Sequence, residues 1–307
     1  MRATIEEILH NGKRVSGVRV RKGATDLVYD LNAPIIISSA GMYNTFNKLL
    51  PKHVASKSIY YPLADYIQPS FATIQGFIGM NASNEELNLK AENVFAYVKN
   101  DCGESHHTEF MDLPREEAMQ KRIPMVFIAS PSAKNPMWGK DPERKNKSTM
   151  TIFTGVPWEW FKEFDGSGLH KRGDKYEEIK ARLGQSMLDL VLEVYPQIEH
   201  HIDYIDYGTP LTNNHYLGVN FGETYGLSCN RERFNDPWLW SQMRPKSDIP
   251  GLYLSGQDNF GPGLMPGVYG GVLAACSVLD RNLFIDLLLL HFNTKMKRPQ
   301  STKAKCL

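Results

Sequence analysis

The segment 251–275 constrains the fold of this chain most, because it joins a short apolar run to a glycine-rich turn and a helical pattern. Residues 252–254 (Leu-Tyr-Leu) predict a buried strand, which ends at Gly256. From Val268 onward, apolar residues recur at helical spacing. The first turn of a helix carries free N–H groups and the positive end of the helix dipole. The segment therefore predicts a site for an anion or for the electron-rich edge of a ring.

The glycines of this segment do not match the dinucleotide fingerprint. Gly261, Gly263 and Gly267 give G-x-G-x-x-x-G, which is one residue longer than that motif. A plain glycine-rich turn between a strand and a helix is therefore an alternative to a ligand site. Small residues continue into the helix, and they would let a ligand or another segment of the protein approach the helix backbone closely. They are Gly267, Gly270, Gly271, Ala274 and Ala275.

Asp258 favours the ligand site over the plain turn. It follows the predicted buried strand and precedes the glycine-rich turn. That position is the carboxyl edge of a sheet, where open α/β sheets bind their ligands. A carboxylate there could accept hydrogen bonds from the hydroxyl groups of a ligand, as acidic residues do with ribose.

The composition is that of an ordinary globular protein with room for one large domain or two small ones. Of the 307 residues, 42% are hydrophobic and 22% charged, and the net charge of +1 argues against a nucleic-acid partner. The four cysteines are scattered without a C-x-x-C pair, and each histidine pair is adjacent in sequence, so no metal site is predicted. We expect neither a secretory signal nor a membrane-spanning segment, because no apolar run reaches about 18 residues.

The first 41 residues predict a small β-meander followed by a buried strand. Asn11-Gly12 is typical of a two-residue hairpin turn, and residues 27–31 are predicted to pair back on the second strand. The continuous apolar run 35–37 indicates a strand that is buried on both faces. This arrangement favours an α/β nucleotide-binding domain over a separate small β-sheet.

Residues 42–245 hold all five tryptophans and predict a second domain of sheet plus helix. A long helix is expected over 174–195, where apolar residues share one face and Pro196 follows. The many aromatic residues of this second domain suit a lid over an apolar ligand, although they would also make an ordinary hydrophobic core. Strands are predicted at 67–78, 93–98, 124–130 and 149–155.

The last residues combine an apolar helical stripe with a basic end. Residues 283–292 could form a core helix, which is slightly favoured for the first half, or a helix on a membrane surface. Lys295, Lys297 and Arg298 would then meet lipid headgroups. Lys303 and Lys305 are similar to the dilysine retrieval signal of endoplasmic-reticulum membrane proteins.

The segment 251–275 resembles the C-terminal flavin motif of the phytoene-desaturase-like FAD oxidoreductases. Further blocks run in family order along nearly the whole chain, and together they match about the C-terminal half of such enzymes. These blocks are 38–45, 113–118, 131–138, 148–150, 159–161, 171–173, 209–213 and 224–226. The resemblance implies that FAD contacts the following residues, with Asp258 at the ribityl chain and the helix N-terminus at the flavin ring: Ala40, Gly256, Asp258, Leu264, Met265, Pro266, Gly267 and Val268.

The resemblance also implies a mixed α/β fold. We expect a Rossmann-like FAD/NAD(P)-binding domain, incomplete at its N-terminus, from residues 1–41 and 246–292. Residues 42–245 would form a mixed-sheet substrate domain, and 293–307 a basic tail. No G-x-G-x-x-G follows a predicted strand in this sequence, so the main pyrophosphate-binding turn of such a domain is missing from it.

The activity implied by the family is saturation of a C=C bond in a retinoid or carotenoid-like polyene by hydride from reduced FAD, with NAD or NADP as a possible electron donor. Peripheral attachment to the endoplasmic-reticulum membrane is implied as well. No catalytic residue is identified; Tyr216 and Tyr225 are candidate proton donors only because they lie in family blocks. The alternatives are an inactive remnant that binds lipid or a partner, and a carotenoid isomerase or desaturase.

Overall fold

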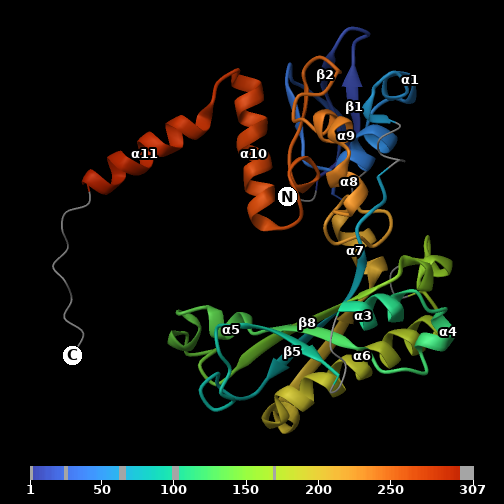
Figure 1. Cartoon of the computed structure of the whole chain (residues 1–307), viewed down its shortest axis with the longest axis vertical. Helices are drawn as coiled ribbons and strands as arrows, with labels where there is room; N and C mark the ends of the chain where they lie inside the picture. The colour runs from blue at the N-terminus through green and yellow to red at the C-terminus, as the bar shows by residue number, and fades with distance from the viewer. Residues whose placement is uncertain (1–2, 24–26, 62–66, 99–103, 169–170, 298–307) are drawn as a thin grey trace. The chain divides into compact units, whose positions relative to one another are not determined.

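The computed structural model describes residues 3–23, 27–61, 67–98, 104–168 and 171–297 (Figure 1). The chain forms two compact units: unit 1 is Met1–Ser70 with Tyr225–Leu307, and unit 2 is Phe71–Thr224. These boundaries differ from the predicted 41/42 and 245/246, because segments 42–70 and 225–245 pack with unit 1. The mixed α/β fold class predicted from the sequence is confirmed.

Unit 1 begins with a three-stranded antiparallel sheet of β1 (Ala3–His10), β2 (Val15–Lys22) and β3 (Val28–Asn32). The predicted meander is therefore confirmed, but its first turn is not the expected two-residue turn. Asn11 N donates to Arg14 O at 3.0 Å, and the Asn11 side chain accepts from the amides of Lys13 and Arg14. The Asn11 carboxamide thus closes a wider, four-residue turn.

The second sheet of unit 1 is a parallel pair, β4 (Ile36–Ser38) with β10 (Leu252–Leu254). Leu252 and Leu254 are buried, as the sequence predicts. The prediction that 35–37 is buried on both faces is wrong for the described chain, in which Ile37 is 52% exposed. Parallel strands become buried on both faces only within larger, covered sheets, and β4 pairs with a single strand among the described residues.

Helices complete unit 1, and the shorter ones contribute Phe46 and Leu239 to a core that also includes Met42 and Leu252. α10 (Leu264–Leu279) begins four residues earlier than the predicted Val268 and is strongly apolar, yet only Gly270 and Ala274 in it are buried. α11 (Leu283–Lys297) likewise exposes most of its apolar residues to solvent, so the core-helix interpretation does not hold within the described chain. The elements are η1 (Asn44–Leu49), α1 (Lys52–Ala55), α8 (Arg231–Asn235), α9 (Pro237–Gln242), η6 (Gln257–Asn259), α10 (Leu264–Leu279) and α11 (Leu283–Lys297).

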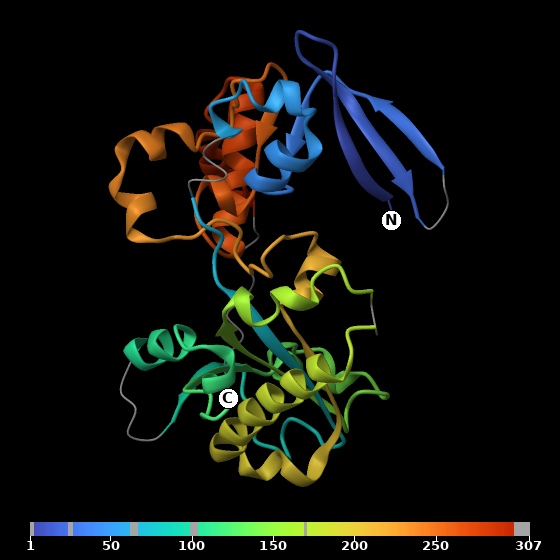
Figure 2. The same ribbon diagram turned by 90° about the vertical axis from the view of Figure 1, so that its right-hand side faces the viewer.

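Unit 2 is a five-stranded antiparallel sheet with α6 (Asp174–Val194) along one face (Figures 1 and 2). The strand order is β6 (Asn93–Tyr97), β7 (Met125–Ala129), β8 (Ser148–Val156), β5 (Ala72–Met80) and β9 (Ile202–Gly208). The predicted strands 93–98, 124–130 and 149–155 and the helix 174–195 are confirmed to within two residues. The strand predicted at 67–78 begins only at Ala72, and β9 was not predicted.

The core of unit 2 lies between α6 and the sheet. Ile74, Ile152 and Val126 from the strands are fully buried against Met187 and Val191 of the helix. Shorter helices surround this layer: α3 (Glu104–Met111), α4 (Arg115–Ala118), α5 (Pro131–Lys134), η2 (Trp138–Lys140), η3 (Trp158–Trp160), η4 (Lys162–Phe164), η5 (Pro196–His201) and α7 (Pro210–Leu217). None of the helices in the described ranges is long and apolar enough to cross a membrane.

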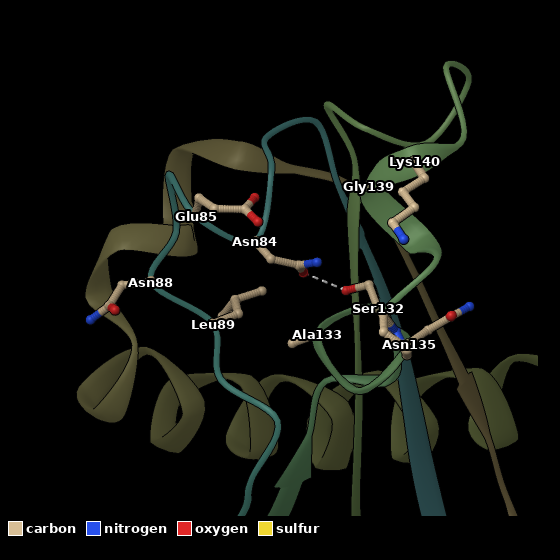
Figure 3. Close-up of a pocket in the computed structure, with 10 residues that line it drawn as sticks. Asn84, Glu85, Asn88, Leu89, Ser132, Ala133, Asn135, Gly139 and Lys140 are labelled. Atoms are coloured by element: carbon tan, nitrogen blue, oxygen red, sulfur yellow. Dashed lines mark hydrogen bonds between the residues drawn. The ribbon is translucent and has the colours of Figure 1, made fainter. Parts of the chain in front are cut away.

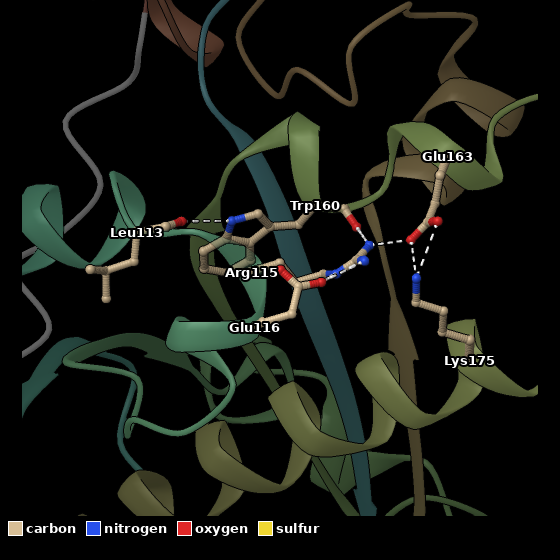
Figure 4. A network of polar contacts seen from close by, with 6 residues as sticks. All are labelled: Leu113, Arg115, Glu116, Trp160, Glu163 and Lys175. Atoms are coloured by element: carbon tan, nitrogen blue, oxygen red, sulfur yellow. Dashed lines mark hydrogen bonds and ion pairs between the residues drawn. The ribbon is translucent and has the colours of Figure 1, made fainter.

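A polar network around Arg115 joins α4 to η3, η4 and α6 (Figure 4). The Arg115 guanidinium donates to the backbone O of Trp160 at 2.8 Å and pairs with Glu116 at 2.9 Å and with Glu163. Lys175 pairs with the same Glu163 at 2.9 Å. The Arg115 side chain is only 13% exposed, whereas Glu116 and Glu163 are 76% and 45% exposed, so the contact with the Trp160 carbonyl is the most shielded of the three.

We expect Arg115→Ala to lower the free energy of unfolding by about 1–3 kcal/mol, because a nearly buried backbone carbonyl loses its donor. Chemical denaturation of the full chain would measure this. Lys121→Ala is the matched control, since Lys121 forms an exposed i,i+4 pair with Glu117 and should change stability by less than about 0.5 kcal/mol. Equal losses in the two variants would contradict a structural role for the Arg115 network.

Candidate functional site

Asp258 is the centre of the predicted flavin edge, and its carboxylate is turned into the protein. It is 6% exposed. Its Oδ2 accepts from Met42 N at 2.7 Å and its Oδ1 from Leu227 N at 2.9 Å. The carboxylate therefore ties three segments of unit 1 together: the turn after β4, the segment at 226–227 and the turn after β10.

Gly226 has to be a glycine for this arrangement to form. Its φ is +68°, and a Cβ at this position would lie 2.2 Å from Oδ1 of Asp258. On the opposite side, a Cβ at Gly41 would lie 3.2 Å from Oδ2. The backbone thus approaches the carboxylate closely from both sides, which explains the small residues in these two family-like blocks.

Arg233 holds the other side of the same turn, and sequence reasoning did not identify it. The guanidinium donates to the backbone O of Leu227 and of Ser228, both at 3.1 Å, and to the backbone O of Asp258 at 2.5 Å. Burial lowers the pKa of Arg233 from its ordinary value. A lone arginine has no spacing signal, so only the fold reveals this role.

The remaining predicted flavin-contact residues lie around the N-terminus of α10. Leu264, Met265, Pro266, Gly267 and Val268 form its first turns, with Leu264 83% exposed. Gly263 precedes the helix with φ +100°, and its amide donates to the Gln257 side chain at 3.2 Å. Ala40 is exposed in the turn after β4. The structure thus gathers Ala40 and the α10 residues within unit 1, around the Asp258 turn.

The small residues of α10 are explained in part by the chain itself. A Cβ at Gly270 would lie 2.3 Å from the backbone O of Gly256, so α10 packs directly on the turn after β10. Gly256, Gly263 and Gly267 are different, because nothing lies within 4 Å of the position that a Cβ would take. The N-terminus of α10 therefore keeps open space over three glycines and fits the edge of a flavin ring. The inward-facing Asp258 carboxylate fits the predicted ribityl contact less well.

The sheet of unit 2 offers an aromatic surface on the face opposite α6. The register places Phe153 beside Phe127, and Phe127 beside Phe95. The ring centroids of Phe95 and Phe127 are 5.0 Å apart, and those of Phe127 and Phe153 4.5 Å apart. Phe95 is 57% exposed, and Phe77 and Tyr204 on the same face are also exposed. We call Phe95, Phe127 and Phe153 the phenylalanine row.

The candidate proton donors named from the sequence belong to different units of the chain. Tyr216 lies on α7 and is 72% exposed. Tyr225 lies at the start of the second segment of unit 1, where its amide donates to the Ser70 hydroxyl. Within the described ranges, no group of three or more His, Cys, Asp or Glu side chains could hold a metal ion.

A separate cavity of about 570 Å³ lies in unit 2, between the turn after β5 and α5 (Figure 3). Its lining is polar. Ser132 is buried there and donates to Asn84 Oδ1 at 2.6 Å, while Asn88, Asn135 and Lys140 complete the rim. A wall of amides, a hydroxyl and an ammonium group suits a small polar molecule better than a polyene.

The sequence is similar to those of known reductases. A zebrafish (Danio rerio) all-trans-retinol 13,14-reductase is 36% identical over 292 residues, which are 94% of this chain and 47% of the relative. The chain is homologous to the all-trans-retinol 13,14-reductases. It spans about half the length of the curated relatives it matches, and this agrees with the predicted match to a C-terminal half.

Two further similarities were found. An inactive all-trans-retinol 13,14-reductase of zebrafish is 30% identical over 296 residues, 96% of this chain and 48% of the relative. A solved oxidoreductase from Methanosarcina mazei is 15% identical, with a TM-score of 0.44 over 91% of this chain and 49% of that one. No protein-family model matches the chain. Nothing in these comparisons supports NAD or NADP as the electron donor of a retinol-reductase homologue.

Proposed function

We propose that this chain supplies the flavin-edge and substrate-binding parts of an FAD-dependent oxidoreductase that saturates a C=C bond of a retinoid or a related polyene. The observation that carries the proposal is its homology to all-trans-retinol 13,14-reductases over 94% or more of its length. The chain spans about half the length of those relatives, so in this proposal the part of the relatives that it does not match contributes to the complete reaction.

Two structural features support the proposal. The N-terminus of α10 presents open backbone over Gly256, Gly263 and Gly267, as a planar ring edge requires. The phenylalanine row gives unit 2 a partly exposed aromatic surface of the kind that an extended apolar molecule covers. Phe95 at the sheet edge and Phe77 on β5 leave exposed rings on this face, which an apolar ligand would cover.

When bound, reduced FAD would supply the hydride that adds to one carbon of the double bond, and a proton would complete the reduction. The residues of this chain would orient and shield the reactants. The amides of Leu264 and Met265, at the start of α10, lack intrahelical acceptors and can donate to the ring edge. Phe95, Phe127 and Phe153 would hold the polyene by apolar contact and exclude water from it.

A non-catalytic role is the second candidate, and two observations favour it. The sequence has no G-x-G-x-x-G after a strand, and one homologous zebrafish protein is described as inactive. In that case the phenylalanine row would still bind an apolar ligand, but no hydride would be transferred. A carotenoid isomerase or desaturase activity is a further possibility within the same class of flavin enzyme.

We expect the chain alone to retain little or no FAD, because the pyrophosphate-binding turn is missing from its sequence. Absorbance of the gel-filtered protein would measure the bound flavin. For activity, the chain should be joined to the part of the zebrafish reductase that it does not match. That fusion should bind FAD and, after reduction, add two hydrogen atoms to all-trans-retinol, as mass spectrometry would show.

The matched control replaces this chain, in the same fusion, with the corresponding segment of the inactive zebrafish relative. That control is expected to give no reduced product. Stoichiometric FAD on the chain alone would contradict the first expectation. A folded, FAD-loaded fusion that leaves the polyene unchanged would contradict the proposed activity and favour the non-catalytic role.

We also propose peripheral attachment to the endoplasmic-reticulum membrane. In α11, the exposed apolar residues Ile285, Leu288, Leu290 and Phe292 are followed by Lys295 and Lys297. Apolar residues with basic neighbours at one end are typical of helices that lie on anionic lipid surfaces. Arg298 and the dilysine positions Lys303 and Lys305 lie outside the described residues.

A further inference from the structure

One buried polar group in unit 2 has no role in the features described above. His107, on α3, has its Nδ1 atom shielded from solvent without a hydrogen-bond partner among the described residues. An unpaired buried polar atom is costly, and native proteins usually satisfy such groups with protein, water or ligand. His106, the preceding residue, is exposed.

The position of His107 connects it to the phenylalanine row. A Cβ at Gly155 would lie 3.0 Å from Nε2 of His107, 3.2 Å from Sδ of Met111 and 3.5 Å from the Phe71 ring. Gly155 and Phe153 are alternate residues of β8, so they share the face opposite α6 and lie about 7 Å apart. The imidazole therefore stands at one end of the aromatic surface.

The same end of the sheet is more polar than its middle. Thr73 pairs with Gly155 across β5 and β8, and its hydroxyl lies 2.9 Å from that of Thr224. Gln75, next on the same face, donates to Thr73 at 3.1 Å. Thr73 is buried, so a ligand on this face would meet phenylalanine rings along its length and the amide of Gln75 and the imidazole of His107 at one end. That pattern fits an apolar molecule with one terminal polar group.

Burial lowers the pKa of His107, so the ring is neutral at pH 7. A neutral imidazole has one N–H donor and one acceptor nitrogen, which is the hydrogen-bonding complement of a hydroxyl group. It has no charge to offer a carboxylate, and a hydrocarbon end would leave its polar atoms unpaired. These properties favour an alcohol over an acid or a hydrocarbon.

We propose that His107 binds the hydroxyl group of a polyene alcohol whose chain lies over the phenylalanine row. This specificity-determining role rests on the proposed function, because it uses the same apolar surface. It adds a residue and a direction to the proposed function: the hydroxyl end lies at His107, near the Gly155 end of β8, and the polyene extends past Phe153 toward Phe127.

The test is a fluorescence titration of the full chain with two ligands, all-trans-retinol and the hydrocarbon in which a methyl group replaces its CH₂OH group. We expect the parent chain to bind the alcohol about tenfold more tightly than the hydrocarbon, as one hydrogen bond to a buried partner allows. His107→Phe should remove this preference and keep hydrocarbon binding. His107→Gln, which retains a donor and an acceptor, should keep part of it.

His106→Phe is the matched control, because it changes the same residue type at the exposed neighbouring position of the same helix. It should leave the preference unchanged. If His107→Phe keeps the tenfold preference, or if His106→Phe loses it equally, the role of His107 is overturned while polyene binding stands. If the parent chain binds neither ligand, the apolar surface is not a polyene site, and the proposed function loses its support from unit 2.

Discussion

Asp258→Ala is expected to destabilise unit 1 by about 3–5 kcal/mol, since each hydrogen bond to a buried carboxylate contributes about 1.5–3 kcal/mol. The substitution removes the acceptor for the amides of Met42 and Leu227. Hydrogen exchange is the most direct measurement, because these two amides should lose protection first. Chemical denaturation would give the free energy of unfolding.

Asp248→Ala is the matched control for this prediction. Asp248 also accepts two hydrogen bonds, from the Ser58 hydroxyl at 2.6 Å and from Ile59 N at 2.9 Å, but it is exposed to solvent. Water can replace its contacts, so the loss should be smaller, within about 1 kcal/mol. If Asp258→Ala folds as stably as the parent and only weakens flavin binding, the carboxylate serves the ligand, as the sequence suggested, and not the fold.

The second large effect concerns α11. Replacing both Leu288 and Leu290 with Gln should weaken binding to anionic liposomes about 100-fold, because burying each leucine in the lipid interface contributes about 1.5–3 kcal/mol. Replacing Lys295, Lys297 and Arg298 with Gln should weaken binding mainly at low salt, at about 1 kcal/mol for each residue. Co-sedimentation with liposomes at two salt concentrations would separate the two contributions.

Leu217→Gln is the control for a general loss of surface hydrophobicity, because Leu217 is a highly exposed leucine on α7. It should sediment like the parent chain. If the Leu288 and Leu290 double variant also sediments like the parent, lipid does not cover α11. Its apolar side chains would then have to be assigned to contact with protein.

Elements with strong local patterns could be predicted from the sequence. α6 combines apolar residues on one helical face with Pro196 two residues after its end, and the predicted range 174–195 matches Asp174–Val194. β8 has polar and apolar residues in alternation over residues 149–152, followed by the apolar Phe153, and this β-rich run predicts a strand. In these segments, burial on one face alone decides the secondary structure.

Features that depend on distant partners could not be predicted. β9 contains two aspartates in a seven-residue strand, and it is fixed by its pairing with β5 more than a hundred residues earlier. Asp258 and Met42 are 216 positions apart, so its position after a strand suggested a ligand contact and not a structural one. The unpaired nitrogen of His107 likewise follows from packing against β8, which no local spacing records.

The two ends of unit 2 are hydrogen-bonded to each other, so the whole unit could be exchanged as one segment during evolution. Thr224 N donates to Phe71 O at 3.2 Å, and Ala72 bridges to Glu223. A continuous segment whose ends meet can be removed, exchanged or inserted as a cassette, leaving a gap that a short linker could close. Recombination at residues 70/71 and 224/225 could therefore replace the whole aromatic sheet in one step, while the hydrogen bonds around Asp258 stay within the flanking segments.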